Sequence, residues 1–271
     1  MARKRNAIMD LKITGKTALV TGSTAGIGLE IARTLAVEGG RVILTGRSQQ
    51  KLNEAIDSIK RSGGDGVIGV LADAATAEGA GTIVKAAPAV DILVNNLGIY
   101  EIKPFGETTD DDWRRFFEVN VLSGARLARH YFQGMIERDA GRIIFVSSES
   151  AIMTPGDMIH YGMTKSAQLA ISRGLAQQTK GTKVTVNTVL PGPTRSEGIV
   201  EFLRGLSTKP GATDAEVELE FFQKHRATSL LQRMIEPQEI ASLVAYLASP
   251  LSAATNGAAL RVDGGLVPTI A

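Results

Sequence analysis

The sequence reads Thr21-Gly22-Ser23-Thr24-Ala25-Gly26-Ile27-Gly28 between a short apolar run, residues 17–21, and an amphipathic helical pattern. Glycines here let the backbone turn tightly and approach a ligand phosphate. The free N–H groups and the positive end of the helix attract a pyrophosphate. A structural turn is the alternative, but the strand before and the helix after favour nucleotide binding. The predicted cofactor-binding residues in this stretch are Gly22, Ser23, Thr24, Gly26, Ile27 and Gly28.

Further apolar runs follow and alternate with helical patterns. They are Val42 to Thr45, Val67 to Val70, Ile92 to Val94, Ile143 to Val146, Val184 to Val189 and Ala259 to Val262. Most are rich in β-branched residues and do not alternate with polar ones, as is typical of strands buried on both faces of a parallel sheet. Repeated β-α-β units predict a doubly wound α/β fold, a mostly parallel seven-stranded sheet with helices on both faces.

The chain of 271 residues, without long linkers or repeats, predicts a single domain over residues 14–271. Residues 1–13 are expected to be a flexible tip, because the formal charge of +2 depends on the three basic residues at positions 3–5. The least regular part, at about residues 195–231, is expected to form a lid over a substrate site.

Composition excludes several classes of function. The sequence has no cysteine, and its three histidines, His130, His160 and His225, are scattered, so a metal site is not expected. No apolar run of about 18 residues exists, and the start MARKRNAIMD lacks the apolar segment of a secretory signal. A cytoplasmic protein without membrane or nucleic-acid partners is therefore expected.

The second strand run ends in Leu44-Thr45-Gly46-Arg47-Ser48, about twenty residues after the glycine loop. In dinucleotide folds a carboxylate at this position binds the ribose 2′-hydroxyl, and an arginine accommodates a 2′-phosphate. Arg47 therefore favours NADP(H) as cofactor, with NAD(H) as the alternative. A solvated arginine at a strand end is the other interpretation.

Tyr161 and Lys165 stand four residues apart in a helical pattern, so their side chains are neighbours on one face. A phenol, whose reference pKa is about 10, is a poor proton donor or acceptor near neutral pH. A cation beside it favours the phenolate, so Lys165 is expected to lower the pKa of Tyr161. The spacing alone also fits an ordinary amphipathic surface pair.

A third signal is Asn120, on the apolar face of a helical pattern that begins near Asp110. A buried amide must find hydrogen-bond partners. A loop contact and a bound water molecule are both open.

Taken together, these motifs resemble the short-chain dehydrogenase/reductase family over nearly all of residues 14–265. The stretches that carry the resemblance are the glycine loop, Asp73, Asn95-Asn96-Leu97-Gly98, Asn120, Ser147-Ser148, Tyr161 with Lys165, Pro191-Gly192 and Val262-Asp263-Gly264-Gly265, in family order. Leu97 departs from the usual alanine, and Ser196 stands where the family usually has threonine. The resemblance implies a Rossmann-type NAD(P)-dependent enzyme.

The resemblance also implies roles for individual residues. The catalytic residues would be Asn120, Ser148, Tyr161 and Lys165, with Ser147 as the alternative serine. Asp73 would contact adenine, Asn95 and Gly98 would line the adenosine side, and Pro191, Gly192, Thr194 and Ser196 would hold the nicotinamide side. Tyr161 and Lys165 would also contact the cofactor, and Asn120 would hold a water that connects Lys165 to solvent.

These residues predict a hydride transfer between nicotinamide and a ketone or secondary alcohol, with Tyr161 as general acid/base and Ser148 as second hydrogen bond to the substrate oxygen. The alternative is a non-catalytic nucleotide-binding regulatory or scaffold protein of the same fold. The substrate is not selected by the sequence. The candidate pocket residues outside the lid are Tyr100, Glu149, Ile152, Met153, Met158 and His160.

Assembly is predicted from two helical patterns, residues 112–138 and 161–180. They carry apolar residues on more faces than one sheet contact needs, which suggests a symmetric interface. The family resemblance points to a homotetramer.

Overall fold

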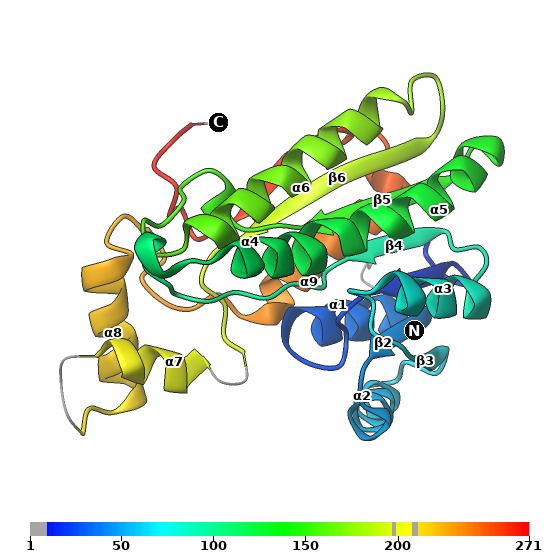
Figure 1. Ribbon diagram of the computed structural model, residues 1–271. Coiled ribbons are helices and arrows are strands. Elements are labelled where there is room, and N and C mark those ends of the chain that lie inside the picture. The colour runs from blue at the N-terminus through cyan, green and yellow to red at the C-terminus, as the bar shows by residue number, and fades with distance from the viewer. Residues whose placement is uncertain (1–9, 197–198, 208–210, 271) are drawn as a thin grey trace, which may run out of the picture.

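The structure, a computed structural model, describes residues 10–196, 199–207 and 211–270 (Figure 1). Seven strands form one parallel sheet in the order β3-β2-β1-β4-β5-β6-β7. The strands are β1 (Thr17–Val20), β2 (Arg41–Gly46), β3 (Val67–Leu71), β4 (Ile92–Asn95), β5 (Gly141–Val146), β6 (Val184–Pro191) and β7 (Ala259–Val262). The order runs outward in both directions from β1 and β4, so the predicted doubly wound fold is confirmed.

Helices cover both faces of this sheet, as predicted. They are α1 (Gly26–Val37), α2 (Gln49–Arg61), α3 (Ala77–Ala86), α4 (Asp110–Phe117), α5 (Ser123–Glu137), α6 (Ile159–Gln177), α7 (Ile199–Leu206), α8 (Asp214–His225) and α9 (Pro237–Ala248). Short single-turn helices are η1 (Phe105–Glu107), η3 (Glu149–Ala151) and η4 (Pro250–Ser252), and η2 (Glu118–Leu122) is π-helical.

Two buried apolar clusters lie on opposite faces of the sheet. One contains the apolar residues of α1, α2 and α9 together with alternate residues of the strands, such as Val20 and Val94. The other contains α3, α5 and α6 with the intervening strand residues, such as Leu19 and Leu93. Figure 1 shows α3, α4, α5 and α6 on the near side of the sheet and α1 and α9 behind it. Burial on both faces explains the continuous apolar runs of the central strands.

The outer strands are less buried. Ile68 and Leu71 of β3, which is the edge strand of the sheet, are more than half exposed. The prediction of a strand from the β-branched residues 67–70 is therefore confirmed, but this strand is less buried than predicted.

The amino-terminal boundary needs a correction. Ile13 belongs to the buried cluster beneath α1, and Leu11 packs against the same cluster. The carbonyl of Leu11 also accepts a hydrogen bond from Ser249 Oγ at 2.6 Å. Residues 11–13 are thus part of the folded domain rather than of a flexible tip. The first nine residues lie outside the described part of the chain.

The predicted lid contains α7 and α8, which Figure 1 shows together at one end of the molecule. Residues 197–198 and 208–210 of this range lie outside the described residues. Leu203, Val217, Phe221, Phe222 and Met234 form a third buried cluster here, separate from the two clusters on the sheet. The two helices therefore pack mainly on each other.

Candidate active site

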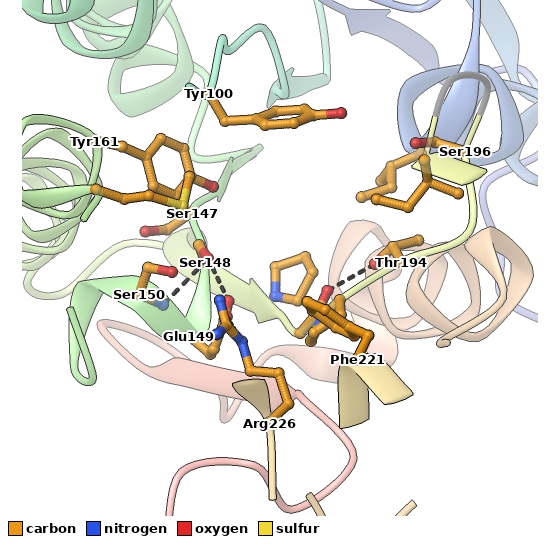
Figure 2. Close-up of a pocket in the computed structure, with 16 residues that line it drawn as sticks. Tyr100, Ser147, Ser148, Glu149, Ser150, Tyr161, Thr194, Ser196, Phe221 and Arg226 are labelled. Carbon is orange, nitrogen blue, oxygen red and sulfur yellow. Dashed lines mark hydrogen bonds and ion pairs between the residues drawn. The ribbon is translucent and has the colours of Figure 1, made fainter. Parts of the chain in front are cut away.

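A hollow of about 800 Å³ opens where the carboxyl ends of β5 and β6 meet the helix pair α7 and α8. Figure 2 shows Tyr161, Ser147 and Ser148 on one side of it, with Thr194, Ser196 and Phe221 opposite. Ligand sites of open parallel sheets lie at this edge, outside the carboxyl ends of the strands. The lining also contains Ile27, Tyr100, Glu149, Ser150, Met158, Pro191, Gly192, Pro193, Ile199 and Arg226.

Tyr161 and Lys165 are one turn apart on α6, as their spacing predicted. Lys165 is buried, its Nζ lies 5.5 Å from the centre of the Tyr161 ring, and it donates to the carbonyl of Val146 at 3.2 Å. Burial lowers the pKa of Lys165 to about 8, although the nearby carboxyl of Glu149 opposes this.

The pKa of Tyr161 departs from the prediction. Burial, followed by the negative charge of Glu149, raises the pKa of the phenol, and the nearby Ser148 hydroxyl only partly opposes the rise. Lys165 does not reverse this direction, because desolvation of the phenolate outweighs attraction to a cation on the face of the ring. In the protein alone, Tyr161 is therefore a protonated phenol at neutral pH.

The two serines that follow β5 have different surroundings. Ser147 Oγ donates to the backbone carbonyl of Lys165 at 2.8 Å and so joins β5 to α6. Ser148 Oγ accepts from the N–H of Ser150 at 3.1 Å and donates to the carboxyl of Glu149. The Ser148 hydroxyl therefore contacts the carboxyl of Glu149, which lines the hollow together with Tyr161. The Ser147 hydroxyl is used in a hydrogen bond at the end of β5.

Asn120 lies in the π-helical turn η2, between α4 and α5. Its Oδ1 accepts from the N–H of Ile99 at 2.8 Å, and its Nδ2 donates to the Ile99 carbonyl and to Thr164 Oγ1 at 2.9 and 3.0 Å. The backbone carbonyl of Asn120 accepts from Gln168 Nε2 at 2.6 Å. Both amide hydrogens are therefore used within the protein, and the loop contact is the alternative that the structure favours.

Gly98 lies beside this network. A Cβ at Gly98 would stand 3.3 Å from Lys165 Nζ and 3.5 Å from Asn120 Oδ1. Gly98 therefore lies next to two of the catalytic candidates, and its predicted contact with the adenosine side of a cofactor stays a prediction. Glycine at this position leaves the space that the Lys165 side chain needs.

A second hollow of about 650 Å³ lies across the glycine loop. Thr24, Arg47 and Asp73 line it, as do Gly22 and Gly46. The Arg47 side chain is 80% exposed, and its Nη1 lies 3.9 Å from Asp73 Oδ2. This hollow has the composition expected for the adenosine end of a dinucleotide, with a cation where a 2′-phosphate would lie.

The glycine loop between the two hollows lets a ligand approach its backbone closely. At Gly28 a Cβ would collide with Asn96 Nδ2 and with the carbonyl of Gly22, so only glycine fits. Ala25 precedes α1 without a side-chain hydrogen bond to the first turn, which has no acidic residue. The N–H groups of that turn are thus available to a phosphate. The two hollows and this helix end fit a dinucleotide cofactor.

Six predicted cofactor residues do not line either hollow: Ser23, Gly26, Gly28, Asn95, Gly98 and Lys165. The side chains of Ser23 and Asn95 are held elsewhere. Ser23 is fully buried: its Oγ donates to the Val20 carbonyl at 2.7 Å and accepts from the N–H of Thr45 at 3.1 Å. Asn95 is buried against Gly124 of α5, and its amide has no hydrogen-bond partner among the described residues. Ser23 therefore links the glycine loop to β1 and β2, and the Asn95 side chain faces α5.

Glu149 and Arg226 add a carboxyl and a guanidinium group to the lining of the first hollow (Figure 2). Arg226 Nε lies 3.9 Å from Glu149 Oε1, and the guanidinium stands 5.5 Å from the centre of the Phe221 ring. Glu149 was a predicted pocket residue, but Arg226 was only part of the predicted lid. No spacing in the sequence relates the two, because the contact joins η3 to the chain that follows α8.

The described residues contain no group of three or more metal-ligating side chains. Among the same residues, no helix has both the length and the apolar character needed to cross a bilayer.

Comparison with known proteins gives full-length matches. A family model described as short chain dehydrogenase matches residues 16–204. An uncharacterized oxidoreductase of Bacillus subtilis (strain 168) is 51% identical over 263 residues, 97% of this chain and 100% of that protein. The 3-oxoacyl-(acyl-carrier-protein) reductase of Vibrio cholerae is 33% identical over 94% of this chain and 99% of the relative. L-sorbose reductase from Gluconobacter frateurii, complexed with NADPH and L-sorbose, matches with a TM-score of 0.90 at 32% identity, covering 97% of this chain and 100% of that one.

Proposed function

Because the chain belongs to the short-chain dehydrogenase/reductase family of oxidoreductases, we propose that it transfers a hydride between NADP(H) and a ketone or secondary alcohol. The observation that carries this proposal is the shared wall of the first hollow, where Tyr161 and Ser148 lie together. Lys165 lies on the turn of α6 that follows Tyr161, with its Nζ near the Tyr161 ring.

Each side chain has a separate task in this proposal. A bound nicotinamide supplies or accepts the hydride. In reduction, Tyr161 donates its proton to the substrate oxygen, and Ser148 hydrogen-bonds the same oxygen as negative charge develops on it. The raised pKa of Tyr161 suits this direction, because the phenol is protonated before the reaction.

Lys165 and Asn120 do not line the first hollow and act through Tyr161 and its surroundings. Lys165, with its pKa near 8, can exchange a proton at neutral pH and is placed to resupply Tyr161. Asn120 is a positioning residue: it fixes the chain at Ile99 and Thr164 and so shapes the space beside Lys165. These contacts favour positioning over the water-holding task predicted for the Asn120 amide.

The cofactor preference rests on Arg47, which is the cation at the corner of the second hollow. NADPH accompanies the similar L-sorbose reductase structure, which agrees with this preference without deciding it. NAD(H) is the alternative cofactor, since Asp73 places a carboxylate at the same corner.

The experiment that tests the function replaces Tyr161 by Phe, which removes the proton and little volume. We expect kcat to fall by at least about a hundredfold with nearly unchanged cofactor affinity, the size of a general acid–base contribution. Ser148→Ala should impair turnover more than Ser147→Ala. Stopped assays with a set of ketones and alcohols, followed by nicotinamide absorbance, give the rates. Near-normal turnover of Tyr161→Phe would favour the non-catalytic nucleotide-binding alternative.

Assembly and location follow as proposals. A surface hollow between α5 and α6 is lined by Phe132, Ile171 and Leu175, apolar side chains that the described chain leaves partly uncovered. This supports a symmetric interface and the predicted homotetramer. A cytoplasmic location stays a prediction.

A further inference from the structure

The carboxyl of Glu149 is buried directly beside the proposed catalytic serine. Only 5% of the Glu149 surface is exposed, and one of its carboxyl oxygens receives the hydrogen bond from Ser148 Oγ. A carboxyl in such a place is costly to ionise unless it is well paired. Its nearest cation, Arg226 Nε, stands 3.9 Å away, beyond hydrogen-bond length.

Counting protons at Ser148 shows why this neighbour matters. A serine hydroxyl has one proton to donate. Its oxygen already accepts from the N–H of Ser150. If Glu149 is ionised, it can only accept, so the single Ser148 proton is used in the bond between them. Ser148 then has no proton to donate to a substrate oxygen, although the proposed reduction requires one.

A protonated Glu149 removes this conflict, because a carboxylic acid can donate to Ser148 Oγ. The charged and titratable groups around Glu149 come from three directions. Burial has the largest effect and raises the pKa of Glu149, whereas hydrogen bonds from Ser148 and Ser150 and the charge of Arg226, after α8, favour the carboxylate without reversing this direction. Tyr161 and Lys165 of α6 and Tyr100 after β4 complete the surroundings.

Given the proposed reduction at Tyr161, we propose that Glu149 is a positioning residue whose protonated carboxyl donates to Ser148 Oγ. The Ser148 hydroxyl proton is then free to reach the substrate oxygen. When Glu149 loses its proton, the Ser148 proton turns to the carboxylate and catalysis declines. Glu149 thus sets the direction of the Ser148 hydrogen bond without touching the reacting atoms.

The proposal predicts that one falling limb of the pH–rate profile reports the loss of the Glu149 proton. In ketone reduction the rate falls as pH rises through the pKa of Glu149, because the ionised carboxylate takes the Ser148 proton. Lys165, with a pKa of about 8, and Tyr161, whose pKa is raised further into the alkaline range, give falls in the same direction. The limb that moves in Glu149→Gln is the one assigned to Glu149.

Glu149→Gln tests this assignment, because an amide always carries hydrogens to donate and has nearly the shape of the acid. Hydride transfer is measured from pH 5 to pH 10 in single turnovers with saturating NADPH and a ketone. We expect the variant to keep the rate that the wild type shows at low pH, within about threefold, and its alkaline fall to begin at least about one pH unit higher. Glu107→Gln, at an exposed carboxyl of η1, is the matched control and should titrate like the wild type.

Arg226→Met gives an independent test that does not require the Glu149 variant to fold. Loss of the cation should raise the pKa of Glu149 and move the limb assigned to Glu149 to higher pH. In the Glu149→Gln background the same change should leave the pH profile where it is. A limb that does not respond to Arg226→Met, or a Glu149→Gln profile that coincides with the wild type, would overturn the assignment.

A rate loss in Glu149→Gln as large as that of Ser148→Ala at every pH would also overturn it. Normal turnover of Tyr161→Phe would contradict the proposed function itself, independently of the result for Glu149. An inactive Tyr161→Phe with an unchanged Glu149→Gln profile would remove only the positioning role of Glu149.

Discussion

Arg47→Ala should separate the two nicotinamide cofactors. A charge-assisted hydrogen bond contributes about 1.5 to 3 kcal/mol, or roughly 10- to 150-fold in affinity. The Arg47 side chain is 80% exposed, so solvent should hold the effect near the lower limit, about tenfold for NADPH. NADH has no 2′-phosphate, and its affinity should change by less than about twofold.

Asp73 adds to the expected loss. Its carboxylate stands 3.9 Å from Arg47, which now offsets its charge. Without the arginine, Asp73 faces the 2′-phosphate with an uncompensated negative charge, which weakens NADPH binding further. Arg47→Ala combined with Asp73→Asn should therefore recover part of the NADPH affinity.

The assay is titration of each cofactor by calorimetry at low and at moderate salt. The NADPH loss in Arg47→Ala should shrink as salt rises, because the interaction is exposed and electrostatic. Arg61→Ala, at the exposed end of α2, removes the same charge elsewhere and serves as control. Equal losses for NADPH and NADH would show that Arg47 only packs against the adenosine, and the NADP preference would then be withdrawn.

The remaining predictions concern packing and assembly. Gly98→Ala places a methyl group 3.3 Å from Lys165 Nζ, and this displacement should lower kcat by about tenfold while the melting temperature changes little; an unchanged kcat would show that the space is not needed. Light scattering at micromolar concentration should give the mass of four 28.7 kDa chains, and Phe132→Glu should give smaller species. A wild type that is only monomeric would contradict the interface proposed on α5 and α6.

Local patterns were sufficient to predict the sheet. Most strand runs were short and β-branched, and helical patterns alternated with them, so the succession of strands and helices followed from local composition and periodicity. The spacing of Tyr161 and Lys165 likewise placed both on one face of α6, because helix geometry relates residues four apart.

Contacts between distant segments were beyond such reasoning. The π-helical turn at Asn120 has no signature in the sequence, and it decides which partners the amide meets. In the protein alone, burial by segments far apart in the chain raises the pKa of Tyr161, an effect that the spacing of Tyr161 and Lys165 does not reveal. Its lowering by Lys165 together with a bound cofactor cation stays a prediction. Arg226 reaches Glu149 only through the fold.

The separate apolar cluster of α7 and α8 has a consequence for motion. Its apolar residues pack on one another, while a polar contact between Arg226 and Glu149 joins this region to the body. Units of this kind open at a lower free energy than the sheet that carries them. Amide hydrogens of α8 should therefore exchange with solvent long before those of β5 and β6. Substrate could then enter and leave by local opening, while the strands beneath Tyr161 and Ser148 stay closed to exchange.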